Sequence, residues 1–288
     1  MKTKLCLVVP CFNESAILVD TINVLQNKLD MLIKDSLITP DSFLFLVNDG
    51  SSDNTSIVAR NALKFAHDDL LFGEVIDLQE NKGPGYALDL GFKAAKGDYI
   101  GFLAADDLYA NPAKLAIQVA EMEKAGSGWS YWSAMLHGPS INESIRIDTS
   151  FVPHLSILDN FIVSHPKIMF IALLFHNPIN SSSILLAKEY RDIWDPELRA
   201  NCDGDILLKL GERGVKGSVI RGLGVFYRDH SNQVSKNITL MQEAIDYVRR
   251  RAVTNALREK KNPLWFRSVL TIFNWYLHTQ HMQLVDEA

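Results

Sequence analysis

The sequence predicts an α/β fold in which a mostly parallel, Rossmann-like sheet is flanked by helices. Short apolar segments alternate with longer segments whose apolar residues recur at helical spacing. The short segments are continuously apolar, which is typical of strands buried on both faces. Polar turns rich in Gly, Asp and Asn follow several of them. Strands that alternate with helices imply parallel pairing through right-handed crossovers.

Length and composition limit the functional classes. The chain has 288 residues, 47% of them hydrophobic, and a formal net charge of −5. This balance argues against a nucleic-acid partner, because general binding to nucleic acid needs a basic face. The odd set Cys6, Cys11 and Cys202 has no metal-ligand spacing. It indicates a reducing compartment, and we expect a cytoplasmic protein.

The first two strand and helix units lie before residue 66. Leu5 to Val9 is an apolar run that is too short for a signal sequence, and we predict that it is the first strand. Pro10 ends it, and Asn13 or Ser15 is expected to cap the helix that follows. Phe43 to Val47 is predicted as the second strand. The polar turn behind it, from Asn48 to Thr55, caps the second helix.

The third unit delivers two carboxylates to the sheet edge. A strand at Val75 to Leu78 precedes a turn at Gly83 to Gly85 and a helix, and the next strand spans Tyr99 to Leu103. Asp106 and Asp107 follow just beyond its carboxyl end, where open α/β sheets bind ligands. Neighbouring carboxylates suit a hard divalent cation, which commonly carries substrate phosphates.

The rest of this region is less regular. Asn111 and Pro112 are predicted to start a helix that runs to about Lys124. Residues 141–178 hold apolar helical pieces that form either a core layer, which we favour, or the wall of an acceptor cleft. The remaining predicted elements are strands at Trp129 to Met135, Ser182 to Ala187, Val215 to Ile220 and Gly224 to Tyr227, and a helix at Asp203 to Gly211.

Residues 236–288 are predicted as a basic, aromatic helical tail behind a domain of residues 1–235. One helix runs from Ile238 to about Lys260, and a second begins at Pro263. Between Lys236 and Arg267 there are eight Lys or Arg against three Asp or Glu. Three interpretations stay open: peripheral contact with the inner face of an anionic membrane, packing on the preceding domain, or packing on a second copy in a homo-oligomer.

Several blocks of sequence point to one family. They are VVPCFNE (8–14), VNDGSSDNT (47–55), NKGPGYALDLGFKAAKGDYIGFLAADD (81–107), CDGDILLKL (202–210) and YRDHSNQVS (227–235). In this order and spacing they resemble the inverting, GT-A-fold glycosyltransferases of family 2. The resemblance covers roughly Leu5 to Ser235, and single DG or DD pairs would carry little weight alone.

The resemblance implies a metal-dependent enzyme that moves a sugar from a UDP- or GDP-sugar to a hydroxyl of a glycan or lipid-linked acceptor, in surface polysaccharide or glycan synthesis. Residues 1–235 would be its nucleotide-sugar-binding and catalytic domain, with Mg²⁺ or Mn²⁺ as cofactor. Asp203 would be the catalytic base, and Asp106 and Asp107 would serve the ribose and the metal. The implied substrate-binding residues are Pro10, Glu14, Asn48, Asp49, Lys82, Gly83, Asp106, Arg228 and His230.

Four positions depart from the family pattern and bear on donor choice more than on reaction type. Asn48 replaces the first Asp of the DDGS block, Leu88 and Asp89 replace Arg-Asn, Ala104 replaces the leading Asp of DxD, and Cys202 replaces the Glu before Asp203. The loss at Ala104 also motivates a non-catalytic nucleotide-binding scaffold as an alternative.

The chemistry itself needs two groups. A departing nucleoside diphosphate needs its charge neutralised, and an acceptor hydroxyl needs a base. Apart from the resemblance, Asp203 would be read as a helix N-cap. A polyprenyl-phosphate sugar synthase is a further alternative, in which the acceptor phosphate is already ionised and no strong base is needed.

The metal ligand has two candidate registers. Alignment on the strand at Tyr99 to Leu103 places Asp106 at the closing Asp of DxD. Alignment on the helix start at Asn111 and Pro112 places Asp107 there and leaves Asp106 to face the ribose. The cap chemistry of an Asn-Pro helix start favours the second register.

Overall fold

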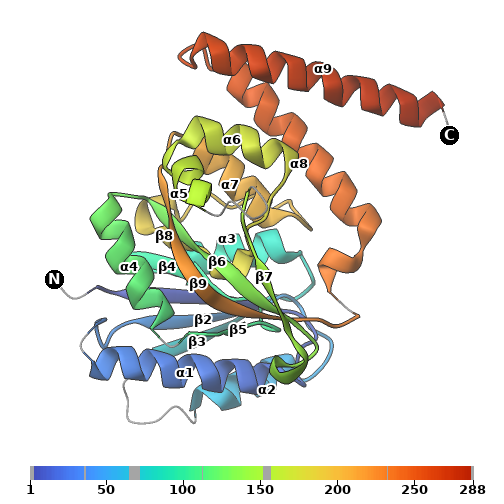
Figure 1. Ribbon diagram of the computed structural model, residues 1–288. Coiled ribbons are helices and arrows are strands. Elements are labelled where there is room, and N and C mark those ends of the chain that lie inside the picture. The colour runs from blue at the N-terminus through green and yellow to red at the C-terminus, as the bar shows by residue number, and fades with distance from the viewer. Residues whose placement is uncertain are drawn as a thin grey trace.

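The structure is a computed structural model that describes residues 3–35, 37–64, 72–111, 113–151, 157–231 and 233–286. Figure 1 shows the arrangement of the elements. The strands are β1 (Leu5–Cys11), β2 (Phe43–Asn48), β3 (Phe72–Asp77), β4 (Tyr99–Phe102), β5 (Leu108–Tyr109), β6 (Trp129–Gly138), β7 (Ile145–Asp148), β8 (Leu185–Ala187) and β9 (Gly217–Arg228). The helices are α1 (Leu18–Lys34), α2 (Thr55–Lys64), α3 (Pro84–Ala94), α4 (Lys114–Ala125), α5 (Ile157–Ser164), α6 (Pro166–Phe175), α7 (Cys202–Glu212), α8 (Ile238–Arg258) and α9 (Leu264–Asp286).

The strands form one mixed sheet in the order β3-β2-β1-β4-β8-β6-β9-β5, with β7 paired to β6. The pairs β3-β2, β2-β1 and β1-β4 are parallel, as is β6-β9, whereas β8 runs antiparallel between β4 and β6. Cys11, Asn48 and Asp77 are register partners at the ends of β1, β2 and β3. The predicted α/β class is confirmed, and the level strand ends place the loops behind them along one edge.

Helices cover both faces of the sheet (Figure 1). On one face, α1, α2 and α4 pack through a cluster that includes Leu25 and Val119. On the other, α3 and α5 to α9 pack through a second cluster that includes Phe92, Phe170 and Ile206. This cluster includes four buried residues of α6, Met169, Phe170, Leu173 and Leu174, which supports the core-layer interpretation for this helix.

Several predicted boundaries were wrong. α1 is capped neither by Asn13 nor by Ser15, because both belong to a loop that is bonded to the next strand's loop. The Asn13 side chain accepts a hydrogen bond from the Ser52 amide, and the Ser15 amide donates to Asp53. β9 is one irregular strand where two were predicted, since Gly222 at φ 126° lets the chain bend without leaving the ladder. The predicted helix start at Pro112 lies outside the described residues.

The tail packs on the rest of the chain. Phe266, Leu270, Phe273 and Leu277 of α9 belong to the same buried cluster as Phe170 of α6. The Phe266 and Phe170 rings lie 5.5 Å apart in an edge-on arrangement. Of the three open interpretations, packing on the preceding domain is therefore observed for one face of the tail.

No single helix among the described residues is long and apolar enough to cross a bilayer. The bent pair Leu158–Ser164 and Pro166–Phe175, which meets at 112°, passes that test only when its two halves are counted together.

We expect Phe266→Ala to lower the free energy of unfolding by about 3–5 kcal/mol, because it deletes a ring that is fully buried on Phe170. Its neighbour Trp265 is half exposed and offers a matched control. Trp265→Ala should change the free energy much less in urea titrations of the full chain. Equal losses for the two variants would show that α9 does not pack as the structure has it.

Candidate active site

A cavity of about 430 Å³ opens at the carboxyl ends of β1, β2 and β4. Of the predicted site residues it is lined by Pro10, Glu14, Asp49, Asp106, Asp107, Asp203 and His230. Four predicted residues do not line the cavity, but each is the sequence neighbour of a residue that does: Asn48, Lys82, Gly83 and Arg228. Met241, the fourth residue of α8, also lines the cavity. The tail therefore contributes to its wall.

Asp106 and His230 meet in this cavity. The His230 Nε2 atom lies 2.9 Å from Asp106 Oδ2, although the two residues are 124 apart in the sequence. The Gln233 amide adds a donor to the same oxygen at 3.4 Å and also bonds the Arg228 carbonyl at 2.7 Å. The loop behind β9 thus holds an imidazole against the first of the two carboxylates.

Asp107 has a different environment. Its side chain is buried, Oδ2 accepts a 2.6 Å hydrogen bond from the Ser182 hydroxyl, and Oδ1 accepts one of 3.3 Å from the Arg228 amide. Burial, together with the charge of Asp106, raises the pKa of Asp107. Both of its oxygens are used to join the loop behind β4 to the segment before β8 and to the end of β9.

Glu14 completes an acidic group. Burial, with a contribution from Asp106, raises the pKa of Glu14 to about 8. Its Oε2 atom is buried and has no hydrogen-bond partner in the described part of the chain. A cation in this region would relieve the repulsion between the carboxylates of Glu14 and Asp106.

The residues present fit a divalent ion of the Mg²⁺ or Mn²⁺ type. Such ions are commonly held by one or two carboxylates, with water and substrate phosphates as the other ligands. Within the described residues no group of three or more His, Cys, Asp and Glu side chains could hold a metal by itself. Asp106 and His230 would therefore act with a phosphorylated substrate, and the orphaned oxygen of Glu14 lies on the same cavity.

Asp49 holds the loop in front of α3. Its two oxygens accept hydrogen bonds from the amides of Lys82 at 2.7 Å and Gly83 at 2.8 Å. Gly83 is the N-cap of α3 at φ 94°, a conformation that favours glycine. The carboxylate therefore fixes the turn that forms one side of the cavity.

Asn48 is paired with a carboxylate on the next strand. Its Nδ2 atom donates to Asp77 Oδ1 at 2.8 Å, and Arg60 pairs with the other oxygen of Asp77. Burial acts to raise the pKa of Asp77, but the hydrogen bonds from Asn48 and Arg60 outweigh it and lower that pKa. The family pattern has an Asp at position 48, and this chain has a carboxylate beside that position at Asp77, on the neighbouring strand β3.

Asp203 lies in the first turn of α7. Asn201 occupies the N-cap with φ 53°, so the simple N-cap interpretation of Asp203 is wrong. Asp203 Oδ2 accepts a 3.0 Å hydrogen bond from Asn177 Nδ2. Burial raises the pKa of Asp203, while hydrogen bonds from backbone amides and Asn177 lessen that rise. The result is a partly desolvated carboxylate held at the cavity wall, which is the setting of a general base.

An ion-pair group holds α7 in place. Arg251 of α8 pairs with Asp205 of α7 and with Asp195 in the preceding loop. Burial works against the charge of the guanidinium, but the two carboxylates outweigh it and raise the pKa of Arg251. The same loop approaches α3, where the Gly85 amide donates to the Leu198 carbonyl at 3.1 Å. The tail thereby stabilises the segment that carries Asp203.

Four contributors to the site were not predicted from the sequence: Asn177, Ser182, Gln233 and Arg251. The first two come from residues 177–183, a mostly polar stretch whose Asn-Pro start is typical of a turn. Gln233 belongs to the YRDHSNQVS block but carried no assigned role. Arg251 had no local signal, because its partners lie on another helix.

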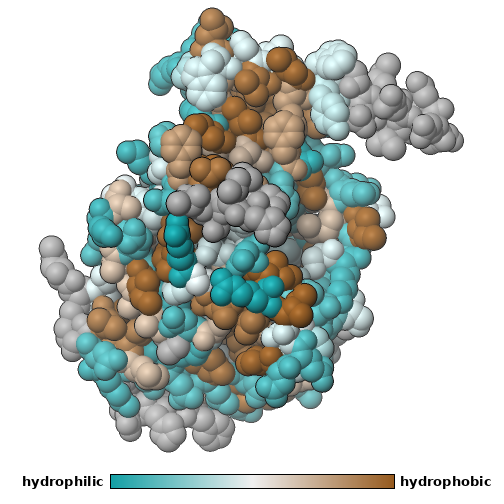
Figure 2. All heavy atoms as spheres, in the orientation of Figure 1, coloured by the Kyte–Doolittle hydropathy of each residue, from teal (hydrophilic) through white to brown (hydrophobic). Residues whose placement is uncertain are grey.

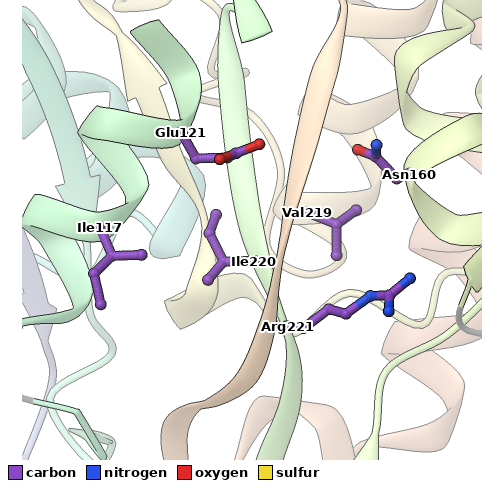
Figure 3. Close-up of a pocket in the computed structure, with 6 residues that line it drawn as sticks. All are labelled: Ile117, Glu121, Asn160, Val219, Ile220 and Arg221. Carbon is purple, nitrogen blue, oxygen red and sulfur yellow. The ribbon is translucent and has the colours of Figure 1, made fainter. Parts of the chain in front are cut away.

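A second hollow is separate from these carboxylates. It measures about 250 Å³ and is lined by Ile117 and Glu121 from α4, Val219, Ile220 and Arg221 from β9, and Asn160 from α5 (Figure 3). None of the predicted site residues lies in its lining. The chemical groups are therefore gathered in the larger cavity.

Comparison with known proteins agrees with this geometry. The model of the family described as glycosyl transferase family 2 matches residues 6–172, more than half of the chain. Poly-beta-1,6-N-acetyl-D-glucosamine synthase of Staphylococcus aureus (strain COL) is 38% identical over 99 residues, which are 34% of this chain. The match spans 20% of that relative's length.

Two solved structures share the fold. S. aureus TarS 1-349 in complex with UDP-GlcNAc matches 96% of this chain and 73% of its own, with a TM-score of 0.66 and 16% identity. The mannosyltransferase PcManGT from Pyrobaculum calidifontis, in complex with GDP-Man and Mn²⁺, matches 96% of this chain and 70% of its own, with a TM-score of 0.58 and 16% identity.

Proposed function

The chain belongs to glycosyl transferase family 2, and from this premise we propose that it moves a sugar from a nucleotide-diphosphate sugar to an acceptor hydroxyl, with inversion and with a divalent cation. One observation carries the proposal. The Asp106 and His230 pair and the carboxylate of Asp203 line the same cavity. The cavity thus offers side chains suited to a diphosphate with its cation and a carboxylate suited to an acceptor hydroxyl.

The residues divide the work as follows. Asp106 and His230 would hold the Mg²⁺ or Mn²⁺ ion, which when bound neutralises charge on the departing diphosphate. Asp203 takes the proton from the acceptor hydroxyl at its carboxylate, and Asn177 keeps that carboxylate oriented. Asp49 fixes the turn before α3 that walls the donor side.

The acceptor class follows from Asp203. A phosphate acceptor is already ionised and needs no base, whereas a hydroxyl does. A desolvated carboxylate whose pKa is raised and which accepts a hydrogen bond from Asn177 favours the hydroxyl acceptor over a polyprenyl phosphate. The likeness to a poly-N-acetylglucosamine synthase supports a growing glycan, free or lipid-linked, as the acceptor.

For the donor we propose UDP-N-acetylglucosamine. The likeness to the poly-N-acetylglucosamine synthase and to TarS bound to UDP-GlcNAc supports this choice, and GDP-mannose is the natural comparison. The walls near β1 and α3, which include Pro10, Phe12 and Asn81, offer room for the nucleoside.

We expect UDP-N-acetylglucosamine with Mn²⁺ to raise the melting temperature more than any other nucleotide sugar in a panel. Ligand at a hundredfold excess over its Kd stabilises a folded protein by about 2.7 kcal/mol, which is readily measured. The same donor with a chelator is the matched control, and it should stabilise the protein much less. A panel in which no nucleotide sugar stabilises the protein, with or without metal, would contradict the proposed activity.

A further inference from the structure

The outer face of α9 is apolar and exposed. It consists of Leu264, Trp265, Ile272, Trp275 and Tyr276, and we call these residues the α9 outer face. Ile272 and Trp275 are each 68% exposed. The buried stripe of α9, formed by Phe266, Leu270, Phe273 and Leu277, lies on the opposite side of the helix. The rings of Trp265 and Tyr276 also touch Phe266 and Phe273 of this stripe, but half or nearly half of each side chain stays exposed.

A cluster of positive charge adjoins this face. The last residue of α8, Arg258, and the segment that follows it expose three cations, Arg258, Lys260 and Lys261, against a single acid, Glu259, and we call these three cations the basic turn. The basic turn ends three residues before Leu264 and Trp265 begin the α9 outer face. Cations and large apolar side chains therefore stand together at the same end of the molecule.

A further exposed apolar side chain lies on the neighbouring helix α6, beside the buried stripe of α9. Phe175, at the end of α6, is 65% exposed, and its ring lies 5.1 Å from that of Phe273. Figure 2 shows hydrophobic atoms gathered over the part of the molecule that holds α6 and the start of α9. In Figure 1 the same helices lie at the end of the molecule remote from α1 and α2.

We propose that the α9 outer face and the basic turn form a docking surface for an anionic lipid bilayer. Trp and Tyr favour the interface between headgroups and acyl chains, since their rings are apolar and carry a polar group. Basic residues beside them are attracted to anionic headgroups. A helix with an apolar outer face and cations at one end matches an element that lies in the plane of a membrane surface.

The charge complement is what separates a bilayer from a second copy of the chain. The chain has a net charge of −5, which in general opposes both a second copy and an anionic bilayer, so the local charge of the basic turn decides between them. A self-contact across the basic turn would bring like charges together. An anionic bilayer instead meets both the cations and the aromatic rings. This docking is independent of the donor and acceptor proposed above.

Tryptophan fluorescence gives a direct test. Trp129, Trp132 and Trp194 are buried, so a blue shift on addition of vesicles would come from Trp265 and Trp275. We expect this shift, and co-sedimentation of the full chain, with phosphatidylcholine vesicles that contain phosphatidylglycerol. Pure phosphatidylcholine vesicles should bind much less. Equal binding to both, or no binding to either, would overturn the proposal.

Variants separate the two parts of the surface. The double variant Lys260→Gln with Lys261→Gln should weaken binding to the anionic vesicles roughly 30-fold, because it removes the attraction of two basic side chains to the charged surface. Trp265→Ser with Trp275→Ser should weaken it about tenfold or more. Two matched controls change exposed residues elsewhere on the surface: the double variant Lys34→Gln with Lys124→Gln, and the single variant Ile57→Ser on α2. Both should bind the anionic vesicles like the unchanged protein.

A second copy of the chain remains the competing occupant. Light scattering of the lipid-free protein should show a monomer at all concentrations. A dimer that the Trp265→Ser and Trp275→Ser variant abolishes, while vesicle binding stays unchanged, would overturn the membrane assignment and make this face an interface between copies.

Discussion

Asp203→Asn is expected to lower the rate of sugar transfer by about 10²–10⁴-fold, the usual contribution of a general base. An amide has the shape of the carboxylate but cannot accept the acceptor's proton. The amide oxygen of the new side chain can still accept the hydrogen bond from Asn177 Nδ2. The proposed donor site is built around Asp106 and His230, so the affinity for the donor should be almost unchanged. Turnover assays with a glycan acceptor, paired with calorimetric titration of the donor, measure both quantities.

The pH profile sharpens this test. Burial raises the pKa of Asp203 above the ordinary value of an aspartate, so the basic form should be lost, and kcat/KM should fall, as the pH drops through that raised pKa. The hydrogen bond from Asn177 favours the charged form. Asn177→Ala should therefore move the acid limb to still higher pH, whereas Asp203→Asn should remove the limb.

A control carboxylate lies nearby. Asp192 is exposed in the loop before α7, and Asp192→Asn should leave both the rate and the pH profile unchanged. If Asp203→Asn kept near normal turnover, the base assignment would be wrong. The ionised acceptor of a polyprenyl-phosphate sugar synthase would then become the better explanation.

The sequence predicted those parts of the fold that depend on local chemistry. Strands such as Leu5–Cys11 are continuous apolar runs, and turns such as Asn48 to Thr55 carry residues that favour turns. The cap of α1 was missed because Asn13 bonds to Ser52, 39 residues away, instead of to its own helix. A side chain that bonds to a distant part of the chain cannot also cap its own helix, and local capping rules do not detect such a bond.

The site shows the same limit. Asp106, Asp203 and His230, which line one cavity, were predicted as site residues because each stands in a block that resembles the family. Ser182 and Arg251 were not, since their roles arise only from partners far along the chain. The tail was ambiguous for a related reason: amphipathic spacing predicts that one face of α9 is buried, but it does not tell protein from membrane for the other.

The choice between Asp106 and Asp107 depends on which oxygens are free. The sequence favoured Asp107 through a helix start at Asn111 and Pro112, but α4 is described from Lys114 onwards. Asp107 is 1% exposed and uses both oxygens for Ser182 and Arg228. Asp106 meets His230, a metal-ligating type of side chain, at the cavity. This geometry favours the strand register, with Asp106 as the metal ligand and Asp107 as a structural carboxylate.

We therefore expect Asp106→Ala to abolish the Mn²⁺-dependent part of UDP binding, and His230→Gln to weaken it, in calorimetric titrations with and without the metal. Asp107→Ala should instead lower the free energy of unfolding by about 1–3 kcal/mol, because the Ser182 hydroxyl and the Arg228 amide lose their acceptor. Below its melting temperature this variant should keep metal-dependent binding. If Asp107→Ala is stably folded and has lost that dependence while Asp106→Ala retains it, the helix register is correct and Asp107 holds the ion.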